Sequence, residues 1–307
     1  MNRKEFLLAS ALGLWTACGK SQKIRLALNW KPEPQFGGFY VMPSEHAPMV
    51  EVLPGGAGTP TVQMIGAGST EFGVVAGDEV VLARSRGNDV VGLFAVFQNC
   101  PQGIMVHASR NLSSIGEVFQ GGTVAMQRGL PFARLLEKKY GFDRVKIVPS
   151  PGGDISAFLR DEMFAQQCFV TSEPLAARRL GATVKVFPVS DVGYNPYLTV
   201  LTTSGDYLRK NPLIVRDVVG AVRLAWRAYL YDPKPANERM NKLNPSMDMG
   251  TFAEVAEAQK PFIQTEETVR SGLGAMTAQR WDTLIKQLHD LGDIPQIIPA
   301  QDCFRSV

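Results

Sequence analysis

Hydrophobic and polar residues alternate along short stretches in the first third of the chain. Residues 24–30 (IRLALNW) and 49–56 (MVEVLPGG) show a period of two, which predicts β-strands. Residues 71–75 and 90–99 are short, mostly apolar runs and predict two further strands. Helices are expected between them, over 59–67 and 79–86. The order βαβαβ therefore predicts an α/β unit with parallel strands.

A second set of strands and helices follows. Residues 100–107 are extended, and 123–127 (TVAMQ), 145–151, 168–171 and 182–189 predict strands. Helices are expected over 132–140, from 154 to about 164, and from 174 onward. The strand 198–203 (LTVLTT) is expected to return to the first unit, and the remaining chain is helical, with Trp226 on a core-facing side.

The first strand runs into a stiff, aromatic segment. Each proline of Lys31-Pro32-Glu33-Pro34 fixes φ and removes an N–H, so this stretch cannot be regular structure. The rings of Trp30, Phe39 and Tyr40 either belong to the core or line a cleft. Their position after the strand favours the cleft, because ligands bind at the carboxyl ends of strands in open α/β sheets.

Three carboxylates and three further polar residues also lie where strands end. Asp78 and Glu79 stand at a strand-to-helix boundary, where one of them is expected to cap the helix and the other can face a ligand. Glu173 near a helix start serves either the helix dipole or a ligand. Tyr194, Asn195 and Tyr197 come from the second unit and offer flat faces with polar groups.

The N-terminus has the composition of an export signal. Arg3 and Lys4 precede an apolar run that is too short to span a bilayer, and Thr16-Ala17 end it before Cys18. We expect residues 1–18 to be a signal peptide and 19–23 a tether. A cysteine after small residues resembles a bacterial lipoprotein box, in which Cys18 carries the lipid; an ordinary cleaved signal peptide is the alternative.

Composition narrows the classes of function. The 307 residues are 45% hydrophobic and 20% charged, enough for two domains with a substantial core. A net charge of +3 without a Lys/Arg run argues against nucleic acid as a partner. Cys100, Cys168 and Cys303 and the three histidines are scattered, so no metal site, disulfide or nucleophilic triad is predicted.

The stretch LALNWKPEPQFGGFYV resembles the opening signature of solute-binding proteins of ABC importers in the thiamine-pyrimidine-precursor group. That group also includes riboflavin, taurine and nitrate binders. The turn after FGVV, with Asp78-Glu79, and the segment YLRKNPLIVRDVVGAVRLAWRAYLYDP resemble the same group. The stretch is similar, too, to fungal pyrimidine synthases that share the fold, but their CCCFC run is reduced here to Cys168-Phe169.

The resemblance implies an α/β type 2 periplasmic-binding-protein fold, with two lobes and a ligand cleft between them. Lobe 1 is expected over 23–104 plus 200–307 and lobe 2 over 105–199, with hinge crossings near 103–108 and 196–202. The implied protein is an exported, lipid-anchored monomer that needs no cofactor, is not an enzyme and serves an ABC permease. It would bind a heteroaromatic solute such as a thiamine pyrimidine precursor, or alternatively riboflavin, a sulfonate or nitrate. The ligand-binding set is expected to be Asn29, Trp30, Phe39, Tyr40, Asp78, Glu79, Glu173, Tyr194, Asn195 and Tyr197.

Overall fold

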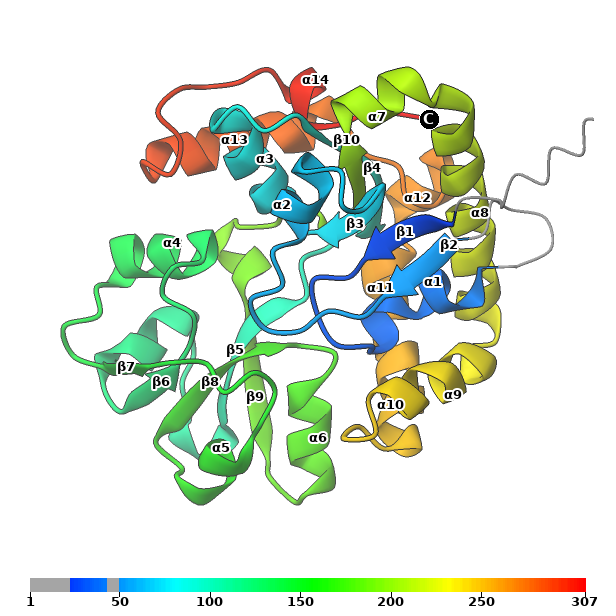
Figure 1. The fold of residues 1–307 in the computed structure, drawn as a ribbon. Helices are drawn as coiled ribbons and strands as arrows, with labels where there is room; N and C mark the ends of the chain where they lie inside the picture. Colours follow the sequence, from blue (N-terminus) through cyan, green and yellow to red (C-terminus); the bar gives the residue numbers. More distant parts are fainter. Residues whose placement is uncertain (1–22, 43–49) are drawn as a thin grey trace, which may run out of the picture.

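The computed structural model describes residues 23–42 and 50–307. The predicted signal peptide, almost all of the predicted tether and the lipidation site Cys18 lie outside these residues. Two α/β lobes make up the described part, each built on a five-stranded sheet (Figure 1).

Lobe 1 contains a mixed sheet in the order β2 (Val50–Leu53), β1 (Ile24–Ala27), β3 (Phe72–Val75), β10 (Leu198–Ser204) and β4 (Val90–Phe97). The first three strands are parallel, and β10 runs antiparallel between β3 and β4. The expected return of 198–203 to the first unit is confirmed. The expectation that the first unit is wholly parallel is wrong at one place, because β10 separates β4 from β3.

Lobe 2 repeats this arrangement in the order β7 (Lys146–Val148), β6 (Thr123–Ala125), β8 (Phe164–Phe169), β5 (Gln102–His107) and β9 (Val184–Pro188). Strands β7, β6 and β8 are parallel, and β5 is antiparallel to both β8 and β9. Since β5 pairs within this sheet from Gln102 onward, the chain crosses between the sheets at 98–101 and again at 193–197. Both crossings come earlier than the predicted 103–108 and 196–202.

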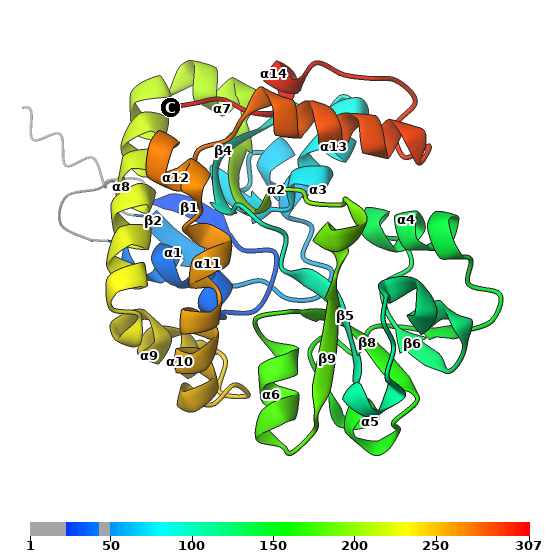
Figure 2. The ribbon, with the colours of Figure 1, turned by 180° about the vertical axis from the view of Figure 1, so that it is seen from behind.

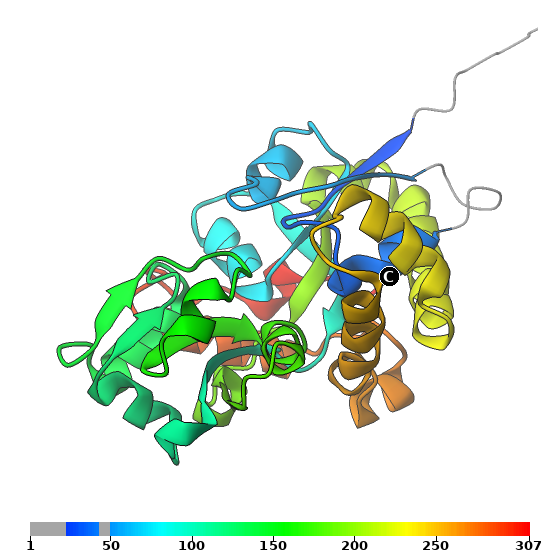
Figure 3. The same cartoon turned by 90° about the horizontal axis from the view of Figure 1, so that it is seen from below.

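Helices cover both faces of the first sheet (Figures 1 and 2). Lobe 1 carries α1 (Gly37–Val41), α2 (Thr61–Gly66), α3 (Gly77–Ser85), α7 (Gly205–Lys210), α8 (Pro212–Tyr231), α9 (Lys234–Leu243), α10 (Met249–Ala258), α11 (Lys260–Ile263), α12 (Glu266–Ser271), α13 (Ala278–Asp290), α14 (Ala300–Cys303) and the 3-10 turn η1 (Pro34–Phe36). Lobe 2 carries α4 (Pro131–Tyr140), α5 (Ser156–Arg160), α6 (Glu173–Arg179) and the 3-10 turns η2 (Ala108–Arg110), η3 (Ile115–Gln120) and η4 (Val189–Val192). Seen from below, the lobes lie side by side (Figure 3).

The aromatic segment after the first strand is helical rather than a loop. Its glycines let α1 approach α8 closely, since a Cβ on Gly38 would lie 2.4 Å from the Trp226 ring. Phe39 meets Trp226 edge to face with ring centroids 5.8 Å apart, and both are buried. The prediction that Trp226 is a core residue is confirmed.

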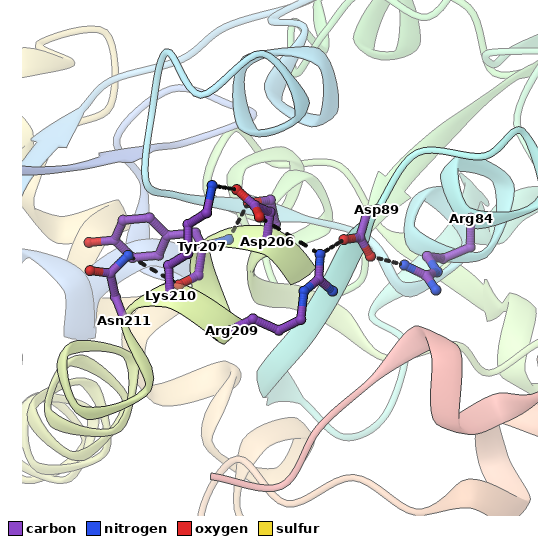
Figure 4. A network of polar contacts seen from close by, with 8 residues as sticks. Arg84, Asp89, Asp206, Tyr207, Arg209, Lys210 and Asn211 are labelled. Atoms are coloured by element: carbon purple, nitrogen blue, oxygen red, sulfur yellow. Dashed lines mark hydrogen bonds and ion pairs between the residues drawn. The ribbon is translucent and has the colours of Figure 1, made fainter.

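An ion-pair network fixes the far end of β10 to the turn before β4 (Figure 4). Asp89 accepts from Arg84 and from Arg209, the latter at 2.9 Å, and its backbone oxygen accepts from the Gly205 amide at 2.7 Å. Lys210 pairs with Asp206 at 2.7 Å on α7. These contacts hold the start of α7 against the turn before β4, at the end of β10 opposite to the second crossing.

The C-terminal segment packs against lobe 1. Phe304 forms a parallel bridge with Gly92 at the edge of β4, and its ring stacks on Trp281. Cys100, Cys168 and Cys303 are buried free thiols, as small apolar residues would be. Within 23–42 and 50–307, no helix is both long and apolar enough to cross a bilayer.

Candidate functional site

A cavity of about 310 Å³ lies at the carboxyl ends of the parallel strands of both lobes. Lobe 1 and the crossing into β10 contribute Asn29, Trp30, Glu33, Gln35, Gly58, Thr59, Ala76, Asp78, Glu79 and Leu198 to its lining. Lobe 2 contributes Gln102, Gln127, Leu130, Phe132, Ser150, Gly152, Gly153, Gln167, Cys168, Phe169, Ser172 and Glu173. Because both lobes line it, movement of one lobe against the other would open or close it.

Trp30 reaches from lobe 1 to the backbone of lobe 2. It follows β1 directly, and its half-buried indole lies 3.5 Å from the position that a Cβ on Gly152 would take. Gly152 has φ +64°, a conformation that favours glycine. The ring thus forms one apolar wall of the cavity, and Phe132 and Phe169 contribute rings from lobe 2.

Asp78 and Glu79 divide the two roles that the sequence left open. The Glu79 carboxylate accepts from the Ala76 amide at 2.7 Å and caps the start of α3. Asp78 Oδ1 accepts from the Glu79 amide at 2.9 Å, and its Oδ2 accepts from the Tyr194 hydroxyl at 2.7 Å. Both carboxylates nevertheless line the cavity.

Burial raises the pKa of both groups. The pKa of Asp78 rises because its charge is desolvated, although the Tyr194 hydrogen bond opposes the shift. Burial, together with the neighbouring charge of Asp78, raises the pKa of Glu79 to about 7. A ligand that donates hydrogen bonds would favour the ionised form of each group.

A second pair of carboxylates comes from opposite lobes. Glu33 lies in the proline-rich segment of lobe 1, where burial and then the charge of Glu173 raise its pKa to about 7. Glu173, at the start of α6, accepts from the Phe169 amide at 2.8 Å, and burial raises its pKa. Two acidic groups therefore face the same cavity from opposite lobes.

Five of the ten predicted site residues line this cavity: Asn29, Trp30, Asp78, Glu79 and Glu173. Phe39 and Tyr40 do not, because α1 turns their rings into the core against α8. Tyr197 is likewise buried, with Arg280 3.9 Å above its ring and its hydroxyl accepting from the Thr277 amide.

Tyr194 and Asn195 belong to the second crossing rather than to the cavity wall. Tyr194 is fully buried behind Asp78. The Asn195 side chain accepts from the Cys100 amide at 2.7 Å, and its amide group lies 3.3 Å from the Asn99 oxygen, so it ties the two crossings together.

Sequence reasoning missed several lining residues. The sequence places Glu33 only in a proline-rich segment and does not single out Gln35, Gln102, Gln127 or Gln167. Gln102 begins β5 and Gln127 follows β6, so a strand end is the signal that could have identified these two. Glu33 lies in the proline-rich segment, Gln35 directly follows it and Gln167 lies inside β8, where no such signal marks them. Gln167 Oε1 accepts from the Gln127 amide at 2.9 Å, so β6 and β8 present this pair together.

The cavity is acidic. Four carboxylates line it, and none of the lining residues in the described part of the chain is Lys, Arg or His. In residues 23–42 and 50–307, no three His, Cys, Asp or Glu side chains are arranged to hold a metal ion. The chemistry offered is that of hydrogen-bond acceptors and amides around flat apolar faces.

A second hollow, of about 340 Å³, lies on the outside of lobe 1 between α8 and α12. Arg227, Tyr231, Gln264, Thr268 and Val269 are among its lining residues. It receives nothing from lobe 2 and no strand end reaches it.

The chain matches the family model described as NMT1/THI5 like over residues 49–236, more than half its length. It is 24% identical over 305 residues to the riboflavin-binding protein RibY of Chloroflexus aurantiacus, covering 92% of this chain and 85% of that protein.

Solved structures share the architecture. The periplasmic aliphatic sulphonate binding protein SsuA from Escherichia coli aligns with a TM-score of 0.68 at 14% identity, covering 93% of this chain and 92% of its own. A Candida albicans protein described as having the generic periplasmic binding protein fold aligns with a TM-score of 0.60 at 11% identity, covering 93% and 96%. The predicted periplasmic-binding-protein fold is confirmed.

Proposed function

The chain belongs to the NMT1/THI5-like family, and because it does, we propose that it is the solute-binding component of an ABC importer. It captures a small heteroaromatic solute between its lobes and retains it by hinge closure. The observation that carries this proposal is the cavity at the strand ends, which both lobes line and whose walls combine Trp30 with four carboxylates. Contacts to both lobes stabilise the closed population, which is how a ligand drives such a change.

The charge of the cavity favours one class of ligand. An oxyanion such as a sulfonate or nitrate needs guanidinium groups, ammonium groups or clustered amides. Here an anion would meet Glu33, Asp78, Glu79 and Glu173 instead. A neutral or cationic ring with several N–H donors is complementary to them, so an aminopyrimidine of the kind that precedes thiamine is the first candidate.

Riboflavin is the second candidate. The relative named as a riboflavin-binding protein aligns over 92% of this chain, which favours it. Four glutamines line the cavity and supply both donors and acceptors, which suits a ring that carries both. A volume of about 310 Å³ lies at the lower end of the range for small-molecule sites. Riboflavin would therefore place its ring system inside and its ribityl chain toward the opening.

Several further parts of the proposal concern the whole protein. We propose export through residues 1–18, a lipid on Cys18, an extracytoplasmic location and a monomer that docks on an ABC permease. The hinge comprises the two crossings, at 98–101 and 193–197. The lobes therefore meet at these segments, and not at the boundaries 104/105 and 199/200 expected from the sequence. The chain acts as a binder without a catalytic step, since Cys168-Phe169 stands where the fungal synthases carry their cysteine run.

A thermal-shift panel tests the function. The mature chain is heated with a hydroxymethyl-aminopyrimidine, thiamine, riboflavin and taurine, each over a range of concentrations. A true ligand raises the melting temperature in step with its concentration, because it binds only the folded state. Stabilisation by the pyrimidine or by riboflavin supports the proposal. Stabilisation by taurine alone would overturn its ligand class, and no response to any of the four would refute the ligand assignment.

A further inference from the structure

One arginine joins the two lobes away from the crossings. Arg179, the last residue of α6 in lobe 2, donates from Nη1 to Thr251 Oγ1 of α10 in lobe 1 at 2.5 Å. Its Nη2 lies 3.1 Å from Asp248 Oδ1. The planar guanidinium thus engages two oxygens of lobe 1 at once, which a lysine could not reproduce.

The two oxygens that accept from Arg179 lie at the start of α10. Asp248 is the N-cap of this helix, and its Oδ1 accepts from the Thr251 amide at 3.0 Å. The Thr251 hydroxyl donates to Asp248 Oδ2 at 2.6 Å, which leaves its oxygen to accept from Arg179. Hydrogen bonds to Thr251 lower the pKa of Asp248 to about 2, and the carboxylate therefore stays ionised.

Gly250 gives the guanidinium its space. A Cβ at this position would lie 2.7 Å from Arg179 Nη2 and 3.0 Å from Asp248 Oδ1. A side chain there would displace the arginine from the helix start. The contact therefore depends on the residue between the two oxygens as well as on the oxygens themselves.

The place of this contact sets it apart from the other contacts between the lobes. On the opposite flank, α4 lies below α13, where Arg134 pairs with Asp293 and Lys138 donates to the Asp290 carbonyl at 2.6 Å (Figures 1 and 2). That flank adjoins the second crossing, since Gln287 of α13 donates to the Gly193 carbonyl. Because Arg179 belongs to lobe 2 and Asp248 and Thr251 belong to lobe 1, their contact on this flank forms only when the lobes approach each other.

We propose that Arg179, Asp248 and Thr251 form a latch that holds the lobes closed and slows the escape of the bound solute. This inference rests on the proposed function, because a latch has a role only in a protein that opens and closes. The contact is partly exposed, with 41% of the Arg179 side chain and 64% of the Asp248 side chain accessible. Its effect is therefore moderate, about 3- to 10-fold in the ratio of closed to open protein.

The test measures the lobes directly and needs no ligand. Cysteines introduced at the exposed positions Glu162 in lobe 2 and Lys242 in lobe 1 are spin-labelled, while the three described native thiols are buried. Pulsed dipolar spectroscopy then gives the distribution of distances between the labels. The measurement is made at about 20 mM and about 500 mM NaCl, because the higher salt concentration screens the ion pair much more strongly.

Three variants are compared with the unsubstituted chain. Arg179→Ala removes the guanidinium, and Asp248→Asn removes the charge while keeping a residue that can cap α10. Arg216→Ala is the matched control, because Arg216 is an exposed arginine of α8 that pairs with Asp217 in the same helix. Circular dichroism confirms that each variant is folded.

We expect R179A and D248N to shift the distribution of label distances from short to long, because fewer molecules are closed. High salt should shift the distribution of the parent chain in the same direction. R216A should leave the distribution unchanged. Distributions of R179A that superimpose on those of the parent at both salt concentrations would overturn the latch. A separate measurement follows the dissociation of riboflavin by fluorescence. R179A is expected to accelerate release about 3- to 10-fold, which is the factor expected for the ratio of closed to open protein. Failure of riboflavin to bind would refute that ligand and leave the distance test of the latch intact.

Discussion

The hydroxyl of Tyr194 donates a 2.7 Å hydrogen bond to Oδ2 of Asp78, and both side chains are buried. Tyr194 lies in the second crossing between the lobes, whereas Asp78 lines the cavity. The bond therefore connects the second crossing, which we propose as part of the hinge, with a side chain that lines the cavity. On the proposed function, Tyr194 would therefore act on the solute indirectly, by orienting the Asp78 carboxylate.

Tyr194→Phe should destabilise the protein by about 1–3 kcal/mol, since it leaves Oδ2 of the buried Asp78 carboxylate without its donor. Urea denaturation at pH 7.5 measures the change. Tyr231→Phe is the control, because Tyr231 is 91% exposed and its hydroxyl should contribute little. Equal stability of the two variants would show that the hydrogen bond contributes nothing measurable.

Gly38→Ala tests the close approach of α1 to α8. A Cβ at this position would lie 2.4 Å from the Trp226 ring, so we expect a loss of about 1–3 kcal/mol from overpacking. Gly220→Ala, in the middle of α8, has no atom within 4 Å of its new Cβ and should instead stabilise by about 0.5–1 kcal/mol. Chemical denaturation of both variants measures these changes. If both substitutions changed the free energy of unfolding in the same direction, the close packing of α1 on α8 would be refuted.

Glu33→Gln tests the acidic cavity through the pH dependence of stability. A carboxyl whose folded pKa is raised to about 7 holds its proton more tightly in the folded state than in the unfolded state. Its destabilising effect is absent below pH 4.5, grows as pH rises through 7, and is complete above that. The ligand-free parent should therefore lose stability between pH 5 and 8, and E33Q should lose about 1–2 kcal/mol less.

Chemical denaturation at pH 5, 6, 7 and 8 gives these slopes. Glu238→Gln, on the exposed surface of α9, should follow the parent at every pH. If E33Q and E238Q had the same slope, Glu33 would not be a desolvated acid in the folded chain.

Trp30→Ala should weaken the binding of the solute by about 1–3 kcal/mol, because the indole wall that faces Gly152 is lost. Trp30→Phe keeps an aromatic face and should recover part of the loss. Fluorescence titration of riboflavin into each variant measures the affinity. If W30A bound riboflavin as tightly as the parent chain does, Trp30 would not be part of the binding site. The half-buried ring would then contribute only to the stability of the fold.

The sequence predicts most of the fold because the strands are short apolar or alternating runs with clear breaks. It does not predict that β10 separates β3 from β4, because pairing between distant strands leaves no local pattern. The crossing points are displaced for the same reason, since β5 pairs with β8 and β9 and begins at Gln102.

The site is predictable where it depends on strand ends and not where it depends on packing. Asn29, Trp30, Asp78, Glu79 and Glu173 stand at the ends of strands or the starts of helices, and the cavity forms there. Phe39 and Tyr40 follow the same strand, β1, but in the aromatic segment that forms α1. Two glycines, however, draw α1 onto α8 and turn both rings inward, and only the three-dimensional packing shows this.

Isothermal titration calorimetry at pH 7.5 decides the charge preference of the cavity. The mature chain and its Glu33→Gln and Glu173→Gln variants are each titrated with the hydroxymethyl-aminopyrimidine, riboflavin and taurine. We expect saturable binding with a stoichiometry of about one for at least one of the two ring compounds, weaker by about 10-fold in either variant, and no heat from taurine. Saturable binding of taurine, unchanged or strengthened by E33Q and E173Q, with no binding of either ring compound would contradict the proposed carboxylate-lined site for a heteroaromatic solute.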